Sequence, residues 1–97
     1  MKHTTIHTTA TRELFSTLAK LNTGNEFSKF FHDLCTREEI EEMAGRWQAV
    51  RLVDKNMPYR TIAKKTGLST ATVTRVAQWL HHGNNGYRLA IRRIKRT

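Results

Sequence analysis

The sequence of 97 residues has few of the residues that cross-link a chain or interrupt its helices: one cysteine, one proline and five glycines. The single cysteine, Cys35, excludes an internal disulfide, which fits a reducing compartment. The longest apolar run, residues 89–91, is far shorter than the roughly 20 residues of a membrane span. Because the N-terminus lacks the apolar region of a secretory signal, we expect a cytoplasmic protein.

Residue patterns typical of metal binding or catalysis are also scarce. His3 and His7 have the i, i+4 spacing of a chelating pair, but no further cysteine or aspartate lies near them in the sequence. The acidic run at residues 38–42 is explained by its place at the start of a helix, where the dipole favours carboxylates. No nucleophile–base signature or glycine-rich phosphate loop occurs. We therefore expect no enzyme, no metal site and no cofactor.

Positive charge is present in excess and gathers in one half of the chain. Seventeen Lys and Arg residues stand against eight Asp and Glu, for a net charge of +9. Residues 1–43 hold five basic and seven acidic residues, whereas residues 44–97 hold twelve basic residues and one acidic residue. This surplus favours a polyanionic partner or an acidic membrane surface. The basic C-terminal segment has no Trp or Phe, so nucleic acid is favoured over a membrane.

Apolar residues recur at helical spacing throughout, and no strand pattern occurs, so we predict an all-α fold. Helices are expected over about residues 14–21 and 27–34, from Arg37 to about Lys55, and from about residue 87. The long third helix should begin after a capping box at Thr36, with an apolar stripe of Ile40, Met43, Trp47 and Val50. We expect residues 1–11 to form a flexible tail and residues 12–97 a single domain.

A helix-turn-helix pattern spans residues 58–82. Pro58 fits the first position of a short helix, and Gly67 supplies the positive φ that the following tight turn requires. Ser69 or Thr70 should cap a second helix that runs to about His82. Its inward stripe is predicted to be Val73, Val76, Ala77 and Leu80.

The side chains that this stripe leaves outside carry the chemistry of DNA recognition. Arginine can pair with guanine, glutamine with adenine, and threonine or alanine methyls with thymine. Cations on the first helix of the motif suit phosphate contacts, which give affinity without sequence information. The predicted DNA-binding residues are Arg60, Lys64, Lys65, Ser69, Thr70, Ala71, Thr72, Thr74, Arg75 and Gln78.

Residues 58–80 and the helix before them resemble the tryptophan repressor superfamily, in particular its YerC/YecD-type branch. The resemblance covers about residues 14–95 and rests on Gly67, Arg46 and the recognition-helix residues Ala71, Thr72, Thr74 and Arg75. It implies a six-helix fold that forms an intertwined homodimer, with the first two helices and the last helix of each chain in a shared core. The aromatic spacing at residues 27–34 is interpreted as core or oligomer contact.

The same resemblance implies a vestigial effector pocket at Arg46, Arg75, Val76 and Trp79. In tryptophan-binding members two arginines sandwich the indole, and Arg46 and Arg75 match them. A glycine and a serine of that pocket are replaced here by Val76 and Trp79. We expect Trp79 to occupy the tryptophan space, although a small-molecule effector stays an open question.

The sequence thus predicts a DNA-binding transcriptional regulator, most simply a bacterial repressor that binds a near-palindromic operator as a homodimer without tryptophan. Double-stranded DNA is the expected partner. Two alternatives remain open. The chain could bind DNA or RNA without sequence preference as a basic structural protein, or it could be the DNA-binding module of a transposition system.

Overall fold

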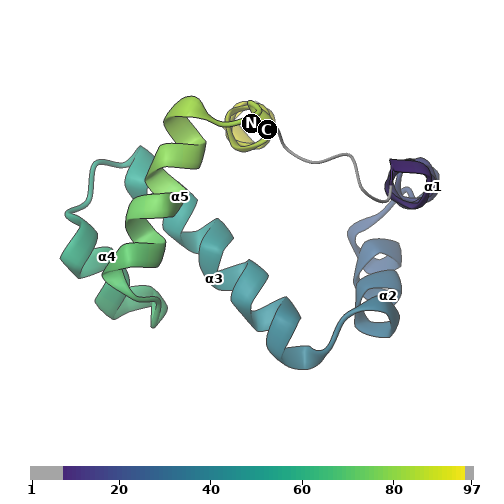
Figure 1. Ribbon diagram of the computed structural model, residues 1–97, viewed down its shortest axis with the longest axis horizontal. Helices are drawn as coiled ribbons and strands as arrows, with labels where there is room; N and C mark the ends of the chain where they lie inside the picture. Colours follow the sequence, from purple (N-terminus) through teal and green to yellow (C-terminus); the bar gives the residue numbers. More distant parts are fainter. Residues whose placement is uncertain (1–7, 96–97) are drawn as a thin grey trace. The chain divides into compact units, whose positions relative to one another are not determined.

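The computed structural model describes residues 8–95 of the chain. This range contains no strand, and its six helices are α1 (Thr8–Leu18), α2 (Gly24–Leu34), α3 (Arg37–Asp54), α4 (Tyr59–Thr66), α5 (Thr70–His82) and α6 (Gly86–Lys95) (Figure 1). The predicted all-α, six-helix fold is therefore confirmed. The chain divides into two compact units, residues 1–37 and 38–97.

Helix α1 begins and ends earlier than the apolar spacing indicates. It starts at Thr8, so residues 8–11, expected within the tail, are helical. It stops at Leu18. Beyond this residue the amides of Lys20 and Leu21 donate to carbonyls three residues earlier, at 3.0 and 3.1 Å, as in a tighter turn. A polar first turn carries no apolar signal, which is why the pattern misses it. Residues 1–7, including His3 and His7, lie outside the described residues, and the 12–97 domain boundary stays a prediction.

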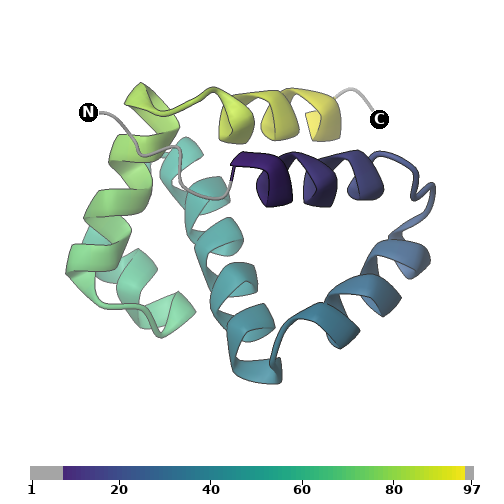
Figure 2. The same cartoon turned by 45° about the vertical axis from the view of Figure 1, so that its right-hand side comes forward.

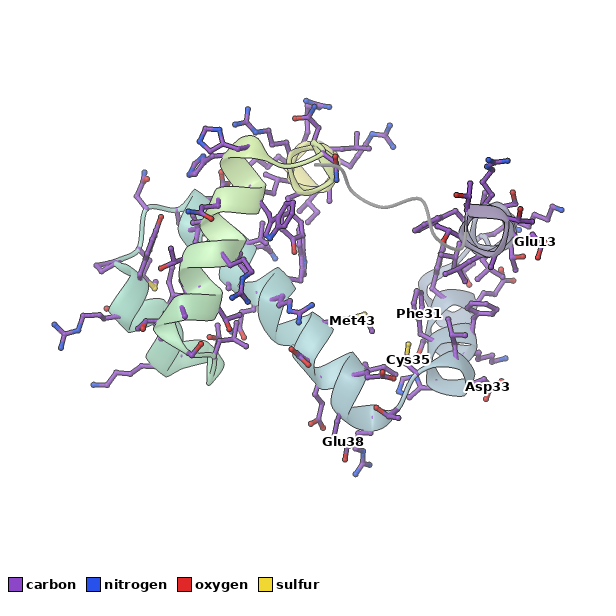
Figure 3. The ribbon with its side chains drawn as sticks, in the orientation of Figure 1. Glu13, Phe31, Asp33, Cys35, Glu38 and Met43 are labelled. Carbon is purple, nitrogen blue, oxygen red and sulfur yellow. The ribbon has the colours of Figure 1, made fainter. Side chains whose placement is uncertain are left out.

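Helix α2 is capped at its start, and none of its side chains is fully buried. The Thr23 hydroxyl accepts the Glu26 amide at 3.1 Å, and the Glu26 carboxylate accepts the Asn22 amide at 2.7 Å. Figure 3 shows Phe31 and Asp33 on opposite sides of the helix. Neither α1 nor α2 contains a buried residue, and Phe15 and Leu34 are 60% and 53% exposed. Side chains of this kind need a partner surface to become stable core.

The core lies in the second unit, where α3, α4 and α5 contribute its buried side chains. Its members are Ala49, Val50, Val53, Ile62, Val73, Val76, Ala77 and Leu80. Figures 1 and 2 both place α4 beside the first turns of α5. Helix α6 follows the end of α5, and its Lys95 ammonium lies 3.0 Å from the Asp54 carboxylate at the end of α3.

The buried part of α3 differs from the stripe that the spacing predicts. Val50 is fully buried, but Ile40 is half-buried and Met43 is 40% exposed. Burial shifts instead to Ala49 and Val53 beside Val50. The three buried residues of α3 all lie in its C-terminal half, so the helix joins the core of the second unit mainly through that half.

Three backbone positions fix the ends of α4 and α5. Pro58 is the N-cap of α4 and not its first helical residue, because its ψ of 142° is extended. Its carbonyl accepts the first helical hydrogen bond, from the Ile62 amide at 3.0 Å. Gly67 ends α4 with φ 78° and donates its amide to the Ala63 carbonyl at 2.9 Å, which confirms the predicted left-handed turn. Ser69, one of the two predicted caps, is the N-cap of α5.

Replacing Gly67 with alanine is expected to lower the free energy of unfolding by about 1–2 kcal/mol, because a Cβ disfavours φ near 78°. Gly86→Ala is the matched control. A Cβ there meets no atom within 4 Å, and alanine should leave stability unchanged or raise it by up to about 1 kcal/mol. Denaturant unfolding at one protein concentration measures both. Equal losses in the two variants would contradict the assigned role of the turn.

Candidate nucleic-acid interface

The turn between α4 and α5 is held by hydrogen bonds that use its own side chains. The Thr66 hydroxyl donates to the Ile62 carbonyl at 2.8 Å and accepts the Leu68 amide at 3.2 Å. Immediately afterwards the Ser69 hydroxyl accepts the Thr72 amide at 3.0 Å. The end of α4 and the start of α5 are therefore both satisfied by side chains of the turn itself.

The side of α5 that faces the core is the one predicted from the sequence. Its buried residues are Val73, Val76, Ala77 and Leu80, which confirms all four. Since successive helical residues turn by about 100°, the remaining positions lie on the outer side. The structure leaves Ser69, Thr70, Ala71, Thr74, Arg75 and Gln78 exposed and Thr72 half-buried. A continuous polar face therefore runs along α5.

Helix α4 adds positive charge next to this face. Arg60, Lys64 and Lys65 are all exposed. A groove of about 680 Å³ brings Arg60 and Lys64 together with Thr70 at the start of α5. Among residues 8–95, ion pairs join Arg46 to Glu42 and Lys95 to Asp54, and none involves these three cations or Arg75. Their charges are thus free for an anionic partner.

A second hollow shares Thr72 and Arg75 with the outer face of α5 and has a volume of about 500 Å³. It brings together all four residues of the expected effector pocket, and its full lining is Arg46, Thr72, Arg75, Val76, Trp79, Asn84, Gly86 and Tyr87. Arg46 is held by Glu42, with Nη2 and Oε2 2.6 Å apart. Trp79 forms part of the wall and is 46% exposed, so open space remains beside its indole.

The described residues contain neither a metal-ligand cluster nor a membrane-spanning helix. No group of three His, Cys, Asp or Glu side chains that could hold a metal ion occurs among residues 8–95. His81 and His82 have ring centroids 6.3 Å apart at the exposed end of α5. No helix in that range is both long and apolar enough to cross a membrane.

Comparison with known proteins assigns the family. The chain matches the Trp repressor protein family over residues 9–95. The chain belongs to the Trp repressor family. It is also 39% identical to the protein YerC of Bacillus subtilis over 85 residues, which are 88% of this chain and 82% of YerC. The resemblance found in the sequence is therefore confirmed.

Two solved structures share the fold of this Trp repressor family member. One comes from Staphylococcus aureus and was solved as a candidate Trp repressor, with a TM-score of 0.83, 36% identity and coverage of 90% of this chain and 87% of that one. The other is a TrpR-like protein from Eubacterium eligens, with a TM-score of 0.84, 36% identity and 90% coverage of each chain. The family is one of helix-turn-helix DNA-binding regulators.

Within this Trp repressor family member, sequence reasoning missed the contribution of the α5–α6 connection and the first turn of α6. Asn84, Gly86 and Tyr87 complete the 500 Å³ cavity, and the Tyr87 ring centroid lies 6.3 Å from that of Trp47. The only sequence signal was the turn at residues 83–86, which marks a helix end but not a cavity wall.

Arg88 was also missed, and it ties α6 to the end of the recognition helix. Its Nε donates to the Leu80 carbonyl and its Nη2 to the His81 carbonyl, both at 2.9 Å. These carbonyls belong to the last turn of α5 and have no partner within the helix. In the sequence, nothing distinguishes Arg88, eight positions after Leu80, from the other arginines of α6.

Arg88→Ala is expected to lower the free energy of unfolding by about 1 kcal/mol, because two carbonyls lose a charged donor at a partly solvated site. The matched control is Arg92→Ala, which removes an exposed arginine of the same helix for which residues 8–95 provide no hydrogen bond or ion pair. Denaturant unfolding should show a change in the free energy of unfolding of no more than about 0.5 kcal/mol for this control. A loss as large in Arg92→Ala would mean that charge, and not the cap, is responsible.

Proposed function

We propose that this protein is a sequence-specific DNA-binding transcriptional regulator, most simply a repressor, that binds a near-palindromic operator as a homodimer. The observation that supports it most is the polar outer face of α5 beside unpaired cations of α4. The turn between these helices is already held in place by its own hydrogen bonds. A preformed face of this kind can enter the major groove without a large ordering cost.

The first unit supports the homodimer. Phe15 on α1 and Leu34 on α2 are exposed in the single chain, and in the second unit so is Met43 in the first half of α3. The second unit has only eight buried apolar side chains of its own. A second copy of the chain would cover such surfaces and enlarge a small core.

A symmetric dimer sets the spacing of its operator. Two recognition helices related by a two-fold axis contact half-sites about 34–36 Å apart, one turn of DNA. Selection of binding duplexes from a random pool at near-physiological salt tests this directly. Recovery of a near-palindrome with that spacing supports the regulator.

The same experiment separates the alternatives. A basic structural protein would retain all duplexes with a specificity ratio near one, whereas specific binders reach about 10³ or more. A DNA-binding module of a transposition system would select an asymmetric or end-specific sequence. No observation on the described residues favours either alternative over the regulator.

Thr74→Ala is expected to weaken the selected duplex more than a random one, because its side chain lies on the outer face of α5, where base edges are reached. Lys65→Ala should weaken both duplexes equally and lower the salt slope of log affinity by about one per half-site, because it removes a phosphate contact. Salt-dependent titrations of both variants measure these effects. If both variants weaken selected and random DNA alike, the division of roles is wrong.

We infer further that DNA binding needs no free tryptophan. Val76 is 3% exposed directly after Arg75, and the Trp79 indole forms part of the cavity wall. Arg46, which matches one of the two indole-stacking arginines, is engaged by Glu42. Compared with a glycine and a serine at the same two positions, Val76 and Trp79 narrow the cavity, and the Glu42 carboxylate offsets the charge of Arg46.

Calorimetric titration of the wild type with tryptophan is therefore expected to give no tight, saturable heat. The Trp79→Ser variant removes the indole from the wall and should bind tryptophan more tightly than the wild type. DNA affinity of the wild type should be the same with and without tryptophan. Tight binding by the wild type, or DNA binding that requires tryptophan, would overturn the inference.

A further inference from the structure

The connection between α5 and α6 ends in an asparagine followed by a glycine, Asn85 and Gly86, and both residues are exposed. Asn85 has a φ of 70°, so the chain changes direction there before α6 begins at Gly86. The Asn85 carbonyl accepts the Leu89 amide at 2.9 Å, the first helical hydrogen bond of α6. Its side-chain amide has no hydrogen-bond partner among residues 8–95. The Cγ of Asn85 is therefore free to rotate toward the backbone nitrogen that follows it.

The backbone nitrogen of Gly86 is also without a hydrogen bond. Gly86 is the first residue of α6, where an amide has no carbonyl of its own helix to reach, and no other acceptor for it occurs in the described range. Glycine has no Cβ, so nothing on Gly86 hinders the approach of the Asn85 side chain. The positive end of the helix dipole stabilises the negative charge that this nitrogen acquires when it loses its proton.

We propose that Asn85 is a site of spontaneous deamidation. The deprotonated Gly86 nitrogen attacks the Asn85 Cγ and forms a new N–C bond, and the side-chain nitrogen takes up a proton and leaves as ammonia. Water then opens the resulting succinimide ring at either of its carbonyls. One opening leaves an ordinary aspartate, and the other leaves an isoaspartate, whose main chain continues through the side-chain carboxyl. Water is the only co-reactant, so the folded protein needs no enzyme for this change.

Asn56 provides an internal control with the same backbone conformation. It is exposed and has a φ of 64°, close to that of Asn85. The residue after it is Met57, and the Met57 amide donates to the Leu52 carbonyl at 3.1 Å. The attacking nitrogen at this position is thus both hindered by a side chain and held in a hydrogen bond. We expect Asn56 to stay intact while Asn85 reacts.

The other three asparagines of the chain also lack the combination found at Asn85. The amide that follows Asn25 donates to the Thr23 hydroxyl at 3.1 Å. Asn22 and Asn84 precede a threonine and an asparagine, whose side chains hinder the attack. The glycine and the unbonded amide therefore single out Asn85.

An isoaspartate would add one atom to the main chain exactly where α6 begins. Tyr87, which lines the 500 Å³ cavity, and Arg88, which donates to the Leu80 and His81 carbonyls, follow immediately. The extra atom displaces both side chains relative to α5, so the Arg88 bonds are lost and stability falls. An ordinary aspartate keeps the length of the chain and visits the left-handed region as asparagine does. The isoaspartate form alone is expected to weaken the attachment of α6.

Ageing of the full-length protein in mildly alkaline buffer, followed by trypsin digestion and mass spectrometry, tests the inference. The tryptic peptide of residues 76–88 contains Asn85, and the peptide of residues 56–60 contains the control Asn56. We expect the mass shift of an amide-to-acid conversion to appear in the first peptide and not in the second, relative to a fresh sample. Fragmentation should place it on Asn85, and an isoaspartyl methyltransferase with labelled S-adenosylmethionine detects the isoaspartate. Mildly acidic buffer should slow the conversion, because the attacking nitrogen must lose its proton.

Gly86→Ala is the matched variant, because a Cβ at this position meets no atom within 4 Å and the fold is kept. The methyl group obstructs the attack and should slow the conversion by roughly tenfold or more, or about 1.4 kcal/mol in the barrier. Melting temperature is the second measurement. It should fall on ageing of the wild type and stay constant on ageing of Gly86→Ala. Asn85→Asp, which adds the charge without the extra main-chain atom, should melt as the fresh wild type does.

Three results would overturn the inference. The first is an unmodified 76–88 peptide after prolonged ageing, or earlier conversion of Asn56 or Asn84 than of Asn85. The second is an equal rate of conversion in the wild type and in Gly86→Ala. The third is an aged, isoaspartate-containing wild type that melts as the fresh protein does, which would contradict the effect on α6. None of these results depends on the DNA-binding function.

Discussion

The four apolar side chains that α5 turns toward the core decide where the candidate functional residues of this helix lie. They bury one side of the helix completely, and the rotation of the α-helix then assigns each polar residue to the opposite side. Val50 of α3 and Ile62 of α4 are both fully buried and belong to the same core cluster as these four side chains. Burial of such side chains contributes about 1.5–3 kcal/mol each, so rotating α5 about its axis would forfeit much of this small core.

The features that sequence reasoning predicted correctly are those governed by local rules. Gly67 takes a positive φ, Ser69 caps α5, and the inward stripe of α5 follows from a period of 3.6 residues. Each depends on neighbours within one or two helical turns. Pro58 is an instructive near miss, because the first helical position and the N-cap both tolerate a residue that lacks an amide hydrogen.

The features that were missed depend on residues that are distant in sequence. Arg88 reaches carbonyls seven and eight residues away across a change of direction, and nothing in its neighbourhood separates it from other arginines. The α3 stripe is buried only at its C-terminal end, where it joins core residues of α4 and α5. The cavity gathered the four expected residues, but Trp79 contributes to its wall and leaves open space, which no spacing rule indicates.

The glycine after the recognition helix has a consequence for how long that helix can be. Gly83 has an ordinary φ of −88°, yet a Cβ on it would clash with the Trp79 carbonyl oxygen. The backbone can turn away from α5 at this point only at a residue without a side chain. The position of the glycine therefore sets the length of α5. One extra residue would rotate everything after it by about 100° and advance it by about 1.5 Å. Arg88 would then point away from the carbonyls it holds, and α6 would lose its register with α3.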